Sequence, residues 1–424
     1  LSAEVTPGPD GMLVSSPKAE ALHRLSLPMR VERLYIYPLL LITFKLSGGA
    51  LALRRWLEGR ISGQGSGQAR PAGAPEGAPS GEGLFLRWGA RVIGWLGRPI
   101  PRAWRERVSG RDLMVILLFV LVLEAALALL YLPLNFYSGF TLAHQFGLST
   151  QAAVGWVSDW VKNLILALVI SGLLWTGFYV LMRLMPRRWP VPAGALMILV
   201  SASLVLITPV VITPLFYEVR KLDTPELRTR ILTLADRAGV QVDEVYVVNA
   251  STKTTRVNAY FTGFGESRRI VLYDTLLTDY TPDQVDVVLA HEMGHWYYRH
   301  MLLAVVGMGV VGWIGLFGLQ WLLNRTWRPL GLSGPSDVAS LPYLMAVVAI
   351  ATILSLPFQN GLARLAERQA DHFSLVVSQR PETFIELFEK FAAQNLSVVN
   401  VPAWEKLLFY THPPIVERVD MADR

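Results

Sequence analysis

Long apolar stretches alternate with polar segments along the chain, and six of them approach or exceed the length of a membrane span. They cover residues 34–53, 113–134, 163–184, 191–213, 301–323 and 341–358. A transmembrane helix needs about 20 predominantly apolar residues, so the pattern predicts about six spans. The first stretch is the weakest, because Lys45 interrupts it. We therefore expect a mainly α-helical, multi-pass integral membrane protein.

The polar segments between the first two stretches predict no packed structure. Residues 62–83 consist largely of Gly, Pro, Ala and Ser, which is typical of a disordered linker. In residues 84–110, Trp, Leu and Ile are mixed with Arg, as in an amphipathic segment at a membrane surface. The predicted organisation begins with an N-terminal region at 1–110, membrane spans at 111–217 and a hairpin of two spans at 301–358.

Residues 218–300 have the periodicity of a small α+β domain. An amphipathic helix is expected near 224–239, and short strands at 244–250, 257–262 and 268–273. A second helix begins after Thr281, where Thr281, Pro282 and Gln284 form a capping sequence. Residues 359–424 predict two more helices, at 361–379 and after Pro381. We expect 218–300 and 359–424 to form one catalytic domain jointly.

Composition leaves the predicted elements unchanged and excludes some classes of protein and site. Hydrophobic residues make up 52% of the chain and charged residues 17%, below the roughly 25% of a soluble domain. The net charge of +6 lies mostly in arginines beside apolar runs, which favours contact with membrane lipids and argues against nucleic acid. The absence of cysteine excludes disulfides and thiolate metal sites. No charged-then-apolar leader follows Leu1, so no cleavable signal peptide is expected.

The candidate chemistry lies on the helix that follows Thr281. His291 and His295 are four residues apart and therefore project from one face of that helix. Two neutral imidazoles at this spacing can share one zinc ion (Zn2+), and Glu292 then lies beside an activated water. Such a carboxylate can take the water's proton and pass it to a leaving amine. His300, five residues past His295, is expected to turn away from the metal.

A catalytic zinc needs a third protein ligand and an open fourth position. The candidate ligand is Glu367, and Asp371 lies one turn beyond it on the same predicted helix face. A carboxylate beside a ligand is a common way to fix a histidine tautomer. By composition alone, these residues are also compatible with a solvated charged face.

Three motifs indicate one family. The sequences HEMGH, ERQAD and THPPIVER, together with NAYFTGFGESRRIVLYDTLL at 258–277, ITPLFYEVRKL at 212–222 and HQFGLST at 144–150, resemble the type I CAAX prenyl endopeptidases. The resemblance runs from about residue 113 to the C-terminus. It implies a membrane zinc metalloendopeptidase with a small α+β zincin-like (gluzincin) domain, one zinc ion per chain, and a peptide or protein substrate that is lipidated or membrane-bound.

The resemblance also implies a role for each candidate residue. His291, His295 and Glu367 correspond to the zinc ligands, Glu292 to the catalytic carboxylate and Asp371 to the partner of a ligand histidine. Three further residues correspond to positions near the substrate backbone or the developing oxyanion: Asn258, His412 and Arg418.

Membrane orientation is predicted in two opposite ways. The family resemblance implies a cytoplasmic catalytic side. The loops on the other side, however, carry eleven arginines in residues 53–112, then Arg187, Arg188, Arg325 and Arg328, whereas 136–161 has no Lys or Arg. The positive-inside rule favours a cytoplasmic location for the arginine-rich side.

Three other functions fit parts of the sequence. An HtpX-like quality-control protease would have the same chemistry but would cut misfolded membrane proteins. A non-catalytic membrane scaffold would keep the zinc for structure, but it would not need Glu292. A transporter is disfavoured because the spans show no repeated halves.

Overall fold

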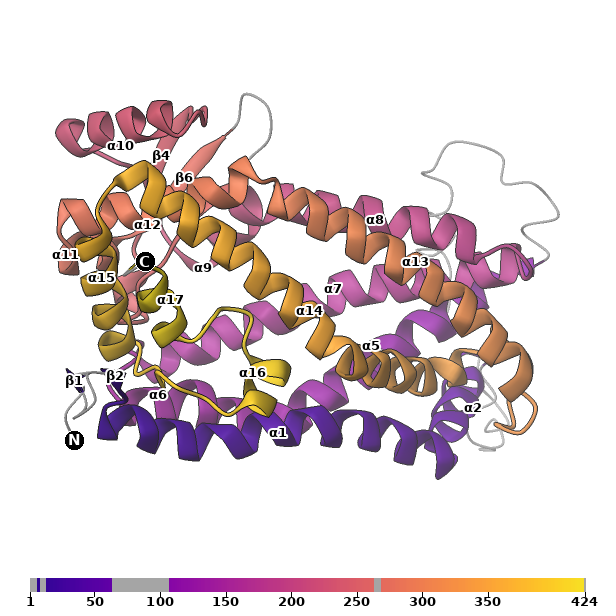
Figure 1. The fold of residues 1–424 in the computed structure, drawn as a ribbon. Helices are drawn as coiled ribbons and strands as arrows, with labels where there is room; N and C mark the ends of the chain where they lie inside the picture. The colour runs from indigo at the N-terminus through magenta and orange to yellow at the C-terminus, as the bar shows by residue number, and fades with distance from the viewer. Residues whose placement is uncertain (1–5, 8–12, 63–106, 263–267, 423–424) are drawn as a thin grey trace, which may run out of the picture.

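The computed structural model describes residues 6–7, 13–62, 107–262 and 268–422. The expected linker at 62–83, except Ser62, and most of the expected interfacial segment at 84–110 lie outside the described residues. In Figure 1 a bundle of long helices runs across the molecule, and a small mixed domain closes one end of it.

Five helical segments of the described chain are long and apolar enough to cross a membrane. They are built on α5 (Gly110–Phe136, continued to Gln145 through a π-helical turn and α6, Leu142–Gln145), α7 (Ala153–Leu184), α8 (Pro190–Ile207, continued to Phe216 through α9, Thr213–Phe216), α13 (His300–Thr326) and α14 (Leu341–Ser378). These helices match five of the six predicted spans, and the protein is an integral multi-pass membrane protein.

The predicted first span is bent in the structure. Helix α1 (Pro17–Leu46) and helix α2 (Gly49–Ile61) meet at 61° and count as a sixth span only if they are taken together. Gly48 makes the bend possible, because its φ of +82° is a left-handed conformation that glycine adopts without a steric penalty. Lys45, the charge that interrupts the stretch, is buried and donates to the carbonyl of Leu330 over 2.9 Å.

The mixed domain contains a four-stranded sheet with the order β3-β4-β6-β5. Strands β4 (Glu244–Val248) and β6 (Arg269–Tyr273) are parallel, while β3 (Val219–Lys221) and β5 (Ala259–Thr262) are the antiparallel edges. Strands β4, β5 and β6 fall where the sequence predicts them, and β3 was not predicted. A separate hairpin pairs β1 (Thr6–Pro7) with β2 (Leu13–Val14).

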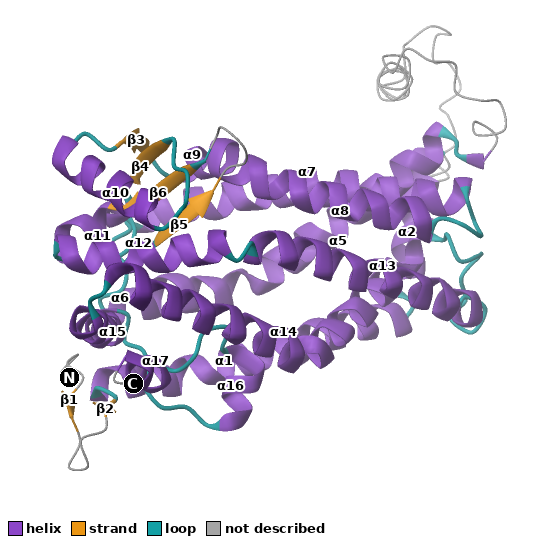
Figure 2. Cartoon of the chain, turned by 45° about the horizontal axis from the view of Figure 1, so that its top comes forward, coloured by secondary structure: helices purple, strands orange, loops and turns teal. Residues whose placement is uncertain are grey.

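Helices from two distant parts of the chain complete this domain. Its buried core joins side chains of the sheet, α10 (Pro225–Arg237), α11 (Asp274–Asp279) and α12 (Pro282–Tyr297) with side chains of α15 (Pro381–Gln394). The chain ends with α16 (Ala403–Phe409) and α17 (Ile415–Ala422). Figure 2 shows the sheet, α10, α11, α12 and α15 gathered at the end of the bundle opposite α2.

Helix α14 is longer than expected and connects the membrane bundle to the mixed domain. The sequence predicts a span at 341–358 and a separate helix at 361–379, but the structure has one helix of 38 residues that continues through Pro357. Apolar composition marks where a helix leaves the membrane and not where the helix ends. The same element therefore spans the bundle and carries Glu367 into the mixed domain.

Candidate metal centre

Helix α12 fixes the first part of the site. The predicted capping box is present: Gln284 N donates to Thr281 Oγ1 over 3.3 Å, and Thr281 N donates to the Gln284 side chain over 3.2 Å. One helical turn separates His291 from His295, and their Nε2 atoms lie 3.2 Å apart. The short distance between two nitrogens indicates that both lone pairs point at one small volume.

Helix α14 packs against α12 closely enough to add a third group. A side chain at Gly294 would come within 3.0 Å of the Cα atom of Ala370, so the glycine in HEMGH permits this approach. Near the other end of the contact, the hydroxyl of Ser374 donates to the Val287 carbonyl over 2.7 Å. The two helices are thereby held so that Glu367 faces the two histidines.

The donor atoms suit a divalent metal. Glu367 Oε2 lies 3.4 Å from His291 Nε2, Glu367 Oε1 lies 3.3 Å from His295 Nε2, and one ligand atom from each residue lies within 4.8 Å of the others. Within the described chain, Oε2 of Glu367 is buried and accepts no hydrogen bond. A buried carboxylate oxygen of this kind calls for a cation. Two imidazoles and one carboxylate form the ligand set of many catalytic zinc sites.

A buried ion pair contacts the Nδ1 side of His291, away from the converging Nε2 atoms. Asp371 Oδ1 lies 2.9 Å from His291 Nδ1, and Arg418 Nε donates to Asp371 Oδ2 over 2.8 Å. Asp371 is fully buried and Arg418 is 7% exposed. An ionised carboxylate can only accept, so Nδ1 of His291 carries the proton and Nε2 is free to bind a metal.

His300 is not part of the metal-binding group, but it contacts the ligand His295, which the sequence did not predict. Helix α12 ends before Arg299, whose φ of +57° turns the chain, and α13 begins at His300. His300 Nδ1 lies 3.0 Å from Nδ1 of His295, and His300 Nε2 lies 2.9 Å from Gln369 Oε1. The prediction assumed one continuous helix, and no glycine marks the break in the sequence.

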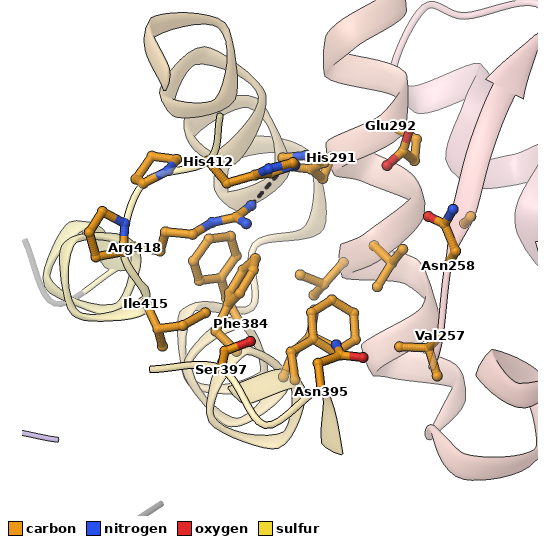
Figure 3. A pocket seen from close by; sticks show the side chains of 18 of the residues that line it. Val257, Asn258, His291, Glu292, Phe384, Asn395, Ser397, His412, Ile415 and Arg418 are labelled. Atoms are coloured by element: carbon orange, nitrogen blue, oxygen red, sulfur yellow. Dashed lines mark hydrogen bonds between the residues drawn. The ribbon is translucent and has the colours of Figure 1, made fainter. Parts of the chain in front are cut away.

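A cavity of about 420 Å3 opens beside this cluster. Figure 3 shows Asn258 on the same side of the cavity as Glu292, while His412 and Arg418 approach from the opposite side. The removal of water around Glu292 raises the pKa of its carboxyl above the usual range. A more basic carboxylate is a better proton acceptor near neutral pH.

The remaining candidates are also close to the cluster. His412 Nε2 lies 3.4 Å from Glu367 Oε1, and its side chain is 60% exposed. Asn258 directly precedes the edge strand β5, and its carbonyl accepts from Tyr273 N over 3.0 Å. The structure thus brings together the eight residues singled out in the sequence and adds two that were missed, His300 and Gln369.

Two family models match the chain. The model of peptidase family M48 matches residues 221–424, which include every residue of the cluster. A model described as CAAX prenyl protease N-terminal, five membrane helices, matches residues 84–218.

Related proteins cover most of the chain. The metalloprotease YhfN of Bacillus subtilis is 33% identical over 79% of this chain and 77% of its own length. CAAX prenyl protease 1 of Saccharomyces cerevisiae is 28% identical over 76% of this chain and 78% of its own. The crystal structure of S. mikatae Ste24p has the same fold, with a TM-score of 0.69 and 24% identity over 92% of this chain and 99% of that one.

Proposed function

This chain belongs to peptidase family M48 and is a membrane metalloprotease, and we propose that it cleaves peptide bonds with one zinc ion held by His291, His295 and Glu367. One observation carries the proposal. Two imidazole nitrogens and a buried carboxylate converge within 4.8 Å, beside a cavity that Glu292 also lines.

Glu292 has the position and the basicity of the proton carrier. When bound, zinc supplies the Lewis acidity that makes a water nucleophilic and polarises a peptide carbonyl. Glu292 follows a ligand directly and takes the proton from that water. It later gives the proton to the nitrogen of the amine that leaves, so the carboxylate is restored at the end of each turnover.

Residues on the two sides of the cavity hold the peptide. Because β5 is an edge strand, an extended substrate can add to the sheet there through backbone hydrogen bonds. The Asn258 amide then stands next to the carbonyl under attack and donates to its oxygen as negative charge develops. His412 and Arg418 face this oxygen from the other side, and Asp371 keeps His291 in its metal-binding tautomer.

The cavity wall favours an apolar residue next to the cleaved bond. Phe384, Phe388 and Phe391, all on α15, line it together with Leu387 and Ile415. A peptide side chain that fills this space exchanges water for apolar contact, at roughly 25 cal/mol per Å2 of buried surface.

The substrate is a lipidated or membrane-bound protein. Helices α13 and α14 run from the membrane bundle directly into the metal cluster, so a substrate held in the bilayer can reach it. The name of the yeast relative, CAAX prenyl protease 1, agrees with a prenylated peptide. If purified protein cut farnesylated and unmodified forms of one peptide equally well, the lipid preference would be wrong and a quality-control protease would fit better.

We infer from the family resemblance that the catalytic domain faces the cytoplasm. The chain has no cysteine, so a single cysteine can be introduced directly, and its labelling reports the side of the membrane. Arg237→Cys, exposed on α10, and Arg187→Cys, exposed in the turn between α7 and α8, mark the two ends of the bundle. In intact cells a membrane-impermeant maleimide should label Arg187→Cys only; labelling of Arg237→Cys only would reverse the orientation.

Metal analysis tests the zinc proposal. The purified chain should contain one zinc ion, Glu367→Ala should contain less than about a tenth of this amount at equal free zinc, and peptide cleavage should stop with a chelator and return with zinc. Glu386→Ala, which changes an exposed glutamate of α15, is the matched control and should keep its zinc. A parent chain without zinc would contradict the proposal, and zinc without cleavage of any peptide would favour a scaffold.

A further inference from the structure

The second ligand histidine is supported differently from the first. No carboxylate of the described residues contacts Nδ1 of His295; its neighbour is the imidazole of His300, 3.0 Å away between the two Nδ1 atoms. The far nitrogen of His300, Nε2, lies 2.9 Å from Gln369 Oε1 on α14. Tyr298 stacks on the His300 ring, with centroids 5.6 Å apart and planes 22° apart, and limits its rotation.

In the hydrogen-bond chain from His295 through His300 to Gln369, the groups at the two ends determine which ring nitrogens carry protons. Gln369 Oε1 can only accept, so the proton of a neutral His300 sits on Nε2 and leaves its Nδ1 as an acceptor. His295 must then donate from Nδ1, which leaves the lone pair of its Nε2 for a metal. If the Gln369 amide were reversed, its NH2 group would face His300 Nε2. The same hydrogen-bond chain would then place a proton on Nε2 of His295 and block metal binding. Only the observed amide orientation is therefore compatible with a metal ligand at His295.

We propose that His300 and Gln369 are positioning residues that hold His295 in its metal-binding tautomer through an uncharged hydrogen-bond chain. The inference rests on the proposed zinc site. The two ligand histidines then have different hydrogen-bond partners. His291 contacts Asp371, whose negative charge Arg418 balances. His295 contacts His300, and the chain through Gln369 adds no charge. The left-handed residue Arg299, at the break between α12 and α13, is what returns His300 to this position.

Substitutions that keep or remove the acceptor separate this role from packing. His300→Asn retains an oxygen where Nδ1 stands, and His300→Leu fills similar space without an acceptor. Gln369→Glu is isosteric and can only accept, whereas Gln369→Leu cannot accept. His372→Asn is the matched control, because His372 is exposed on α14 and the described structure gives it no hydrogen bond.

The readout is zinc affinity of the full chain in detergent, measured by competition with a chelator, together with the visible spectrum of the cobalt-substituted protein. His300→Leu should weaken zinc binding by about 10–100-fold, the usual cost of losing a partner of a ligand histidine, and should change the cobalt spectrum. His300→Asn and Gln369→Glu should stay within about threefold of the parent, and Gln369→Leu should fall between these limits. At saturating zinc, the KM for a peptide should hardly change.

Two outcomes would overturn the inference. If His300→Leu binds zinc as tightly as His372→Asn, His300 does not position the ligand. If Gln369→Glu loses affinity as severely as His300→Leu, the amide is a donor and the proton order is reversed. The Gln369 pair keeps the test decisive if His300→Leu does not fold. Failure of the parent chain to bind zinc would instead refute the zinc site itself, so the two failures are distinguishable.

Discussion

Arg418 donates from Nε to Asp371 Oδ2 over 2.8 Å and makes a second bond from Nη2 to Oδ1, so the C-terminal helix α17 is locked onto the helix that carries Glu367. Both side chains are buried, and Asp371 also contacts His291. The pair therefore connects the end of the chain to the metal cluster, and folding of the C-terminal segment and assembly of the cluster are coupled.

Removing the Arg418 side chain should lower the free energy of unfolding by more than the loss of its contacts alone. Arg418→Leu leaves the Asp371 carboxylate buried without its cation, for which a loss of about 3–5 kcal/mol is typical. Arg368→Leu is the control, because Arg368 is exposed and its partner Glu417 also contacts Lys406, and exposed pairs contribute about 0–1 kcal/mol. Thermal unfolding in detergent measures both, and equal unfolding temperatures for the two variants would contradict this account.

The Asn258 amide should matter for turnover and not for metal binding. Asn258→Ala is expected to lower kcat by about a hundredfold, the usual cost of one oxyanion donor, with zinc content unchanged. Asn258→Asp keeps the shape of the side chain but removes the donor, and it should lose as much. A kcat near that of the parent in Asn258→Asp would show that the side chain only fills space.

Local signals carried the sequence predictions that succeeded. The start of α12 was predicted because Thr281 and Gln284 satisfy backbone groups within one turn, and two histidines four residues apart share a face of any helix. Strands β4 and β6 were predicted from runs of β-branched and aromatic residues. Bringing Glu367 to these histidines depends on the contact between α12 and α14, which only the family motif indicated.

The features that the sequence did not predict depend on tertiary structure. Strand β3 is three residues long, and only its pairing with β4 makes it a strand. The position of His300 depends on one left-handed residue, Arg299, for which the sequence has no glycine signal. Helix α14 continues past the apolar stretch because its polar end is covered by the mixed domain.

Close packing of α8 against α13 should make one glycine indispensable. A Cβ atom at Gly194 would overlap the indole of Trp313, which is fixed by a 2.9 Å bond from its Nε1 to the Pro190 carbonyl. Gly194→Ala is expected to destabilise the bundle by about 1–3 kcal/mol. Gly315→Ala on α13, where no described atom lies within 4 Å, is the matched control and should be neutral or stabilising. Similar unfolding temperatures for the two would contradict the packing argument.

Acid should remove a stabilising contact at the sheet. Hydrogen bonds from Lys221, at 2.7 Å, and Arg228, at 3.2 Å, lower the pKa of Glu244 from 4.5 to about 2. The unfolded chain binds this proton first as pH falls, so the stabilisation is complete above about pH 4.5 and disappears as pH approaches 2.

The matching variant is Glu244→Gln. At pH 7 it should be less stable than the parent by about 1 kcal/mol after allowance for solvent screening, and the difference should shrink between pH 4.5 and 3. Unfolding temperatures of both proteins across this range provide the check. A difference that stays constant with pH would mean that the charge of Glu244 contributes nothing.

Zinc content and peptidase activity, compared in the parent chain and in Glu292→Gln, test the metal-dependent cleavage most directly. The substitution keeps the size of the side chain and leaves His291, His295 and Glu367 intact. We expect one zinc ion per chain in both proteins, with cleavage in Glu292→Gln lower by about 100–10,000-fold, the range for loss of a general base. If Glu292→Gln retains zinc and cleaves peptide at the rate of the parent, Glu292 is not the proton acceptor and the proposed reaction is wrong.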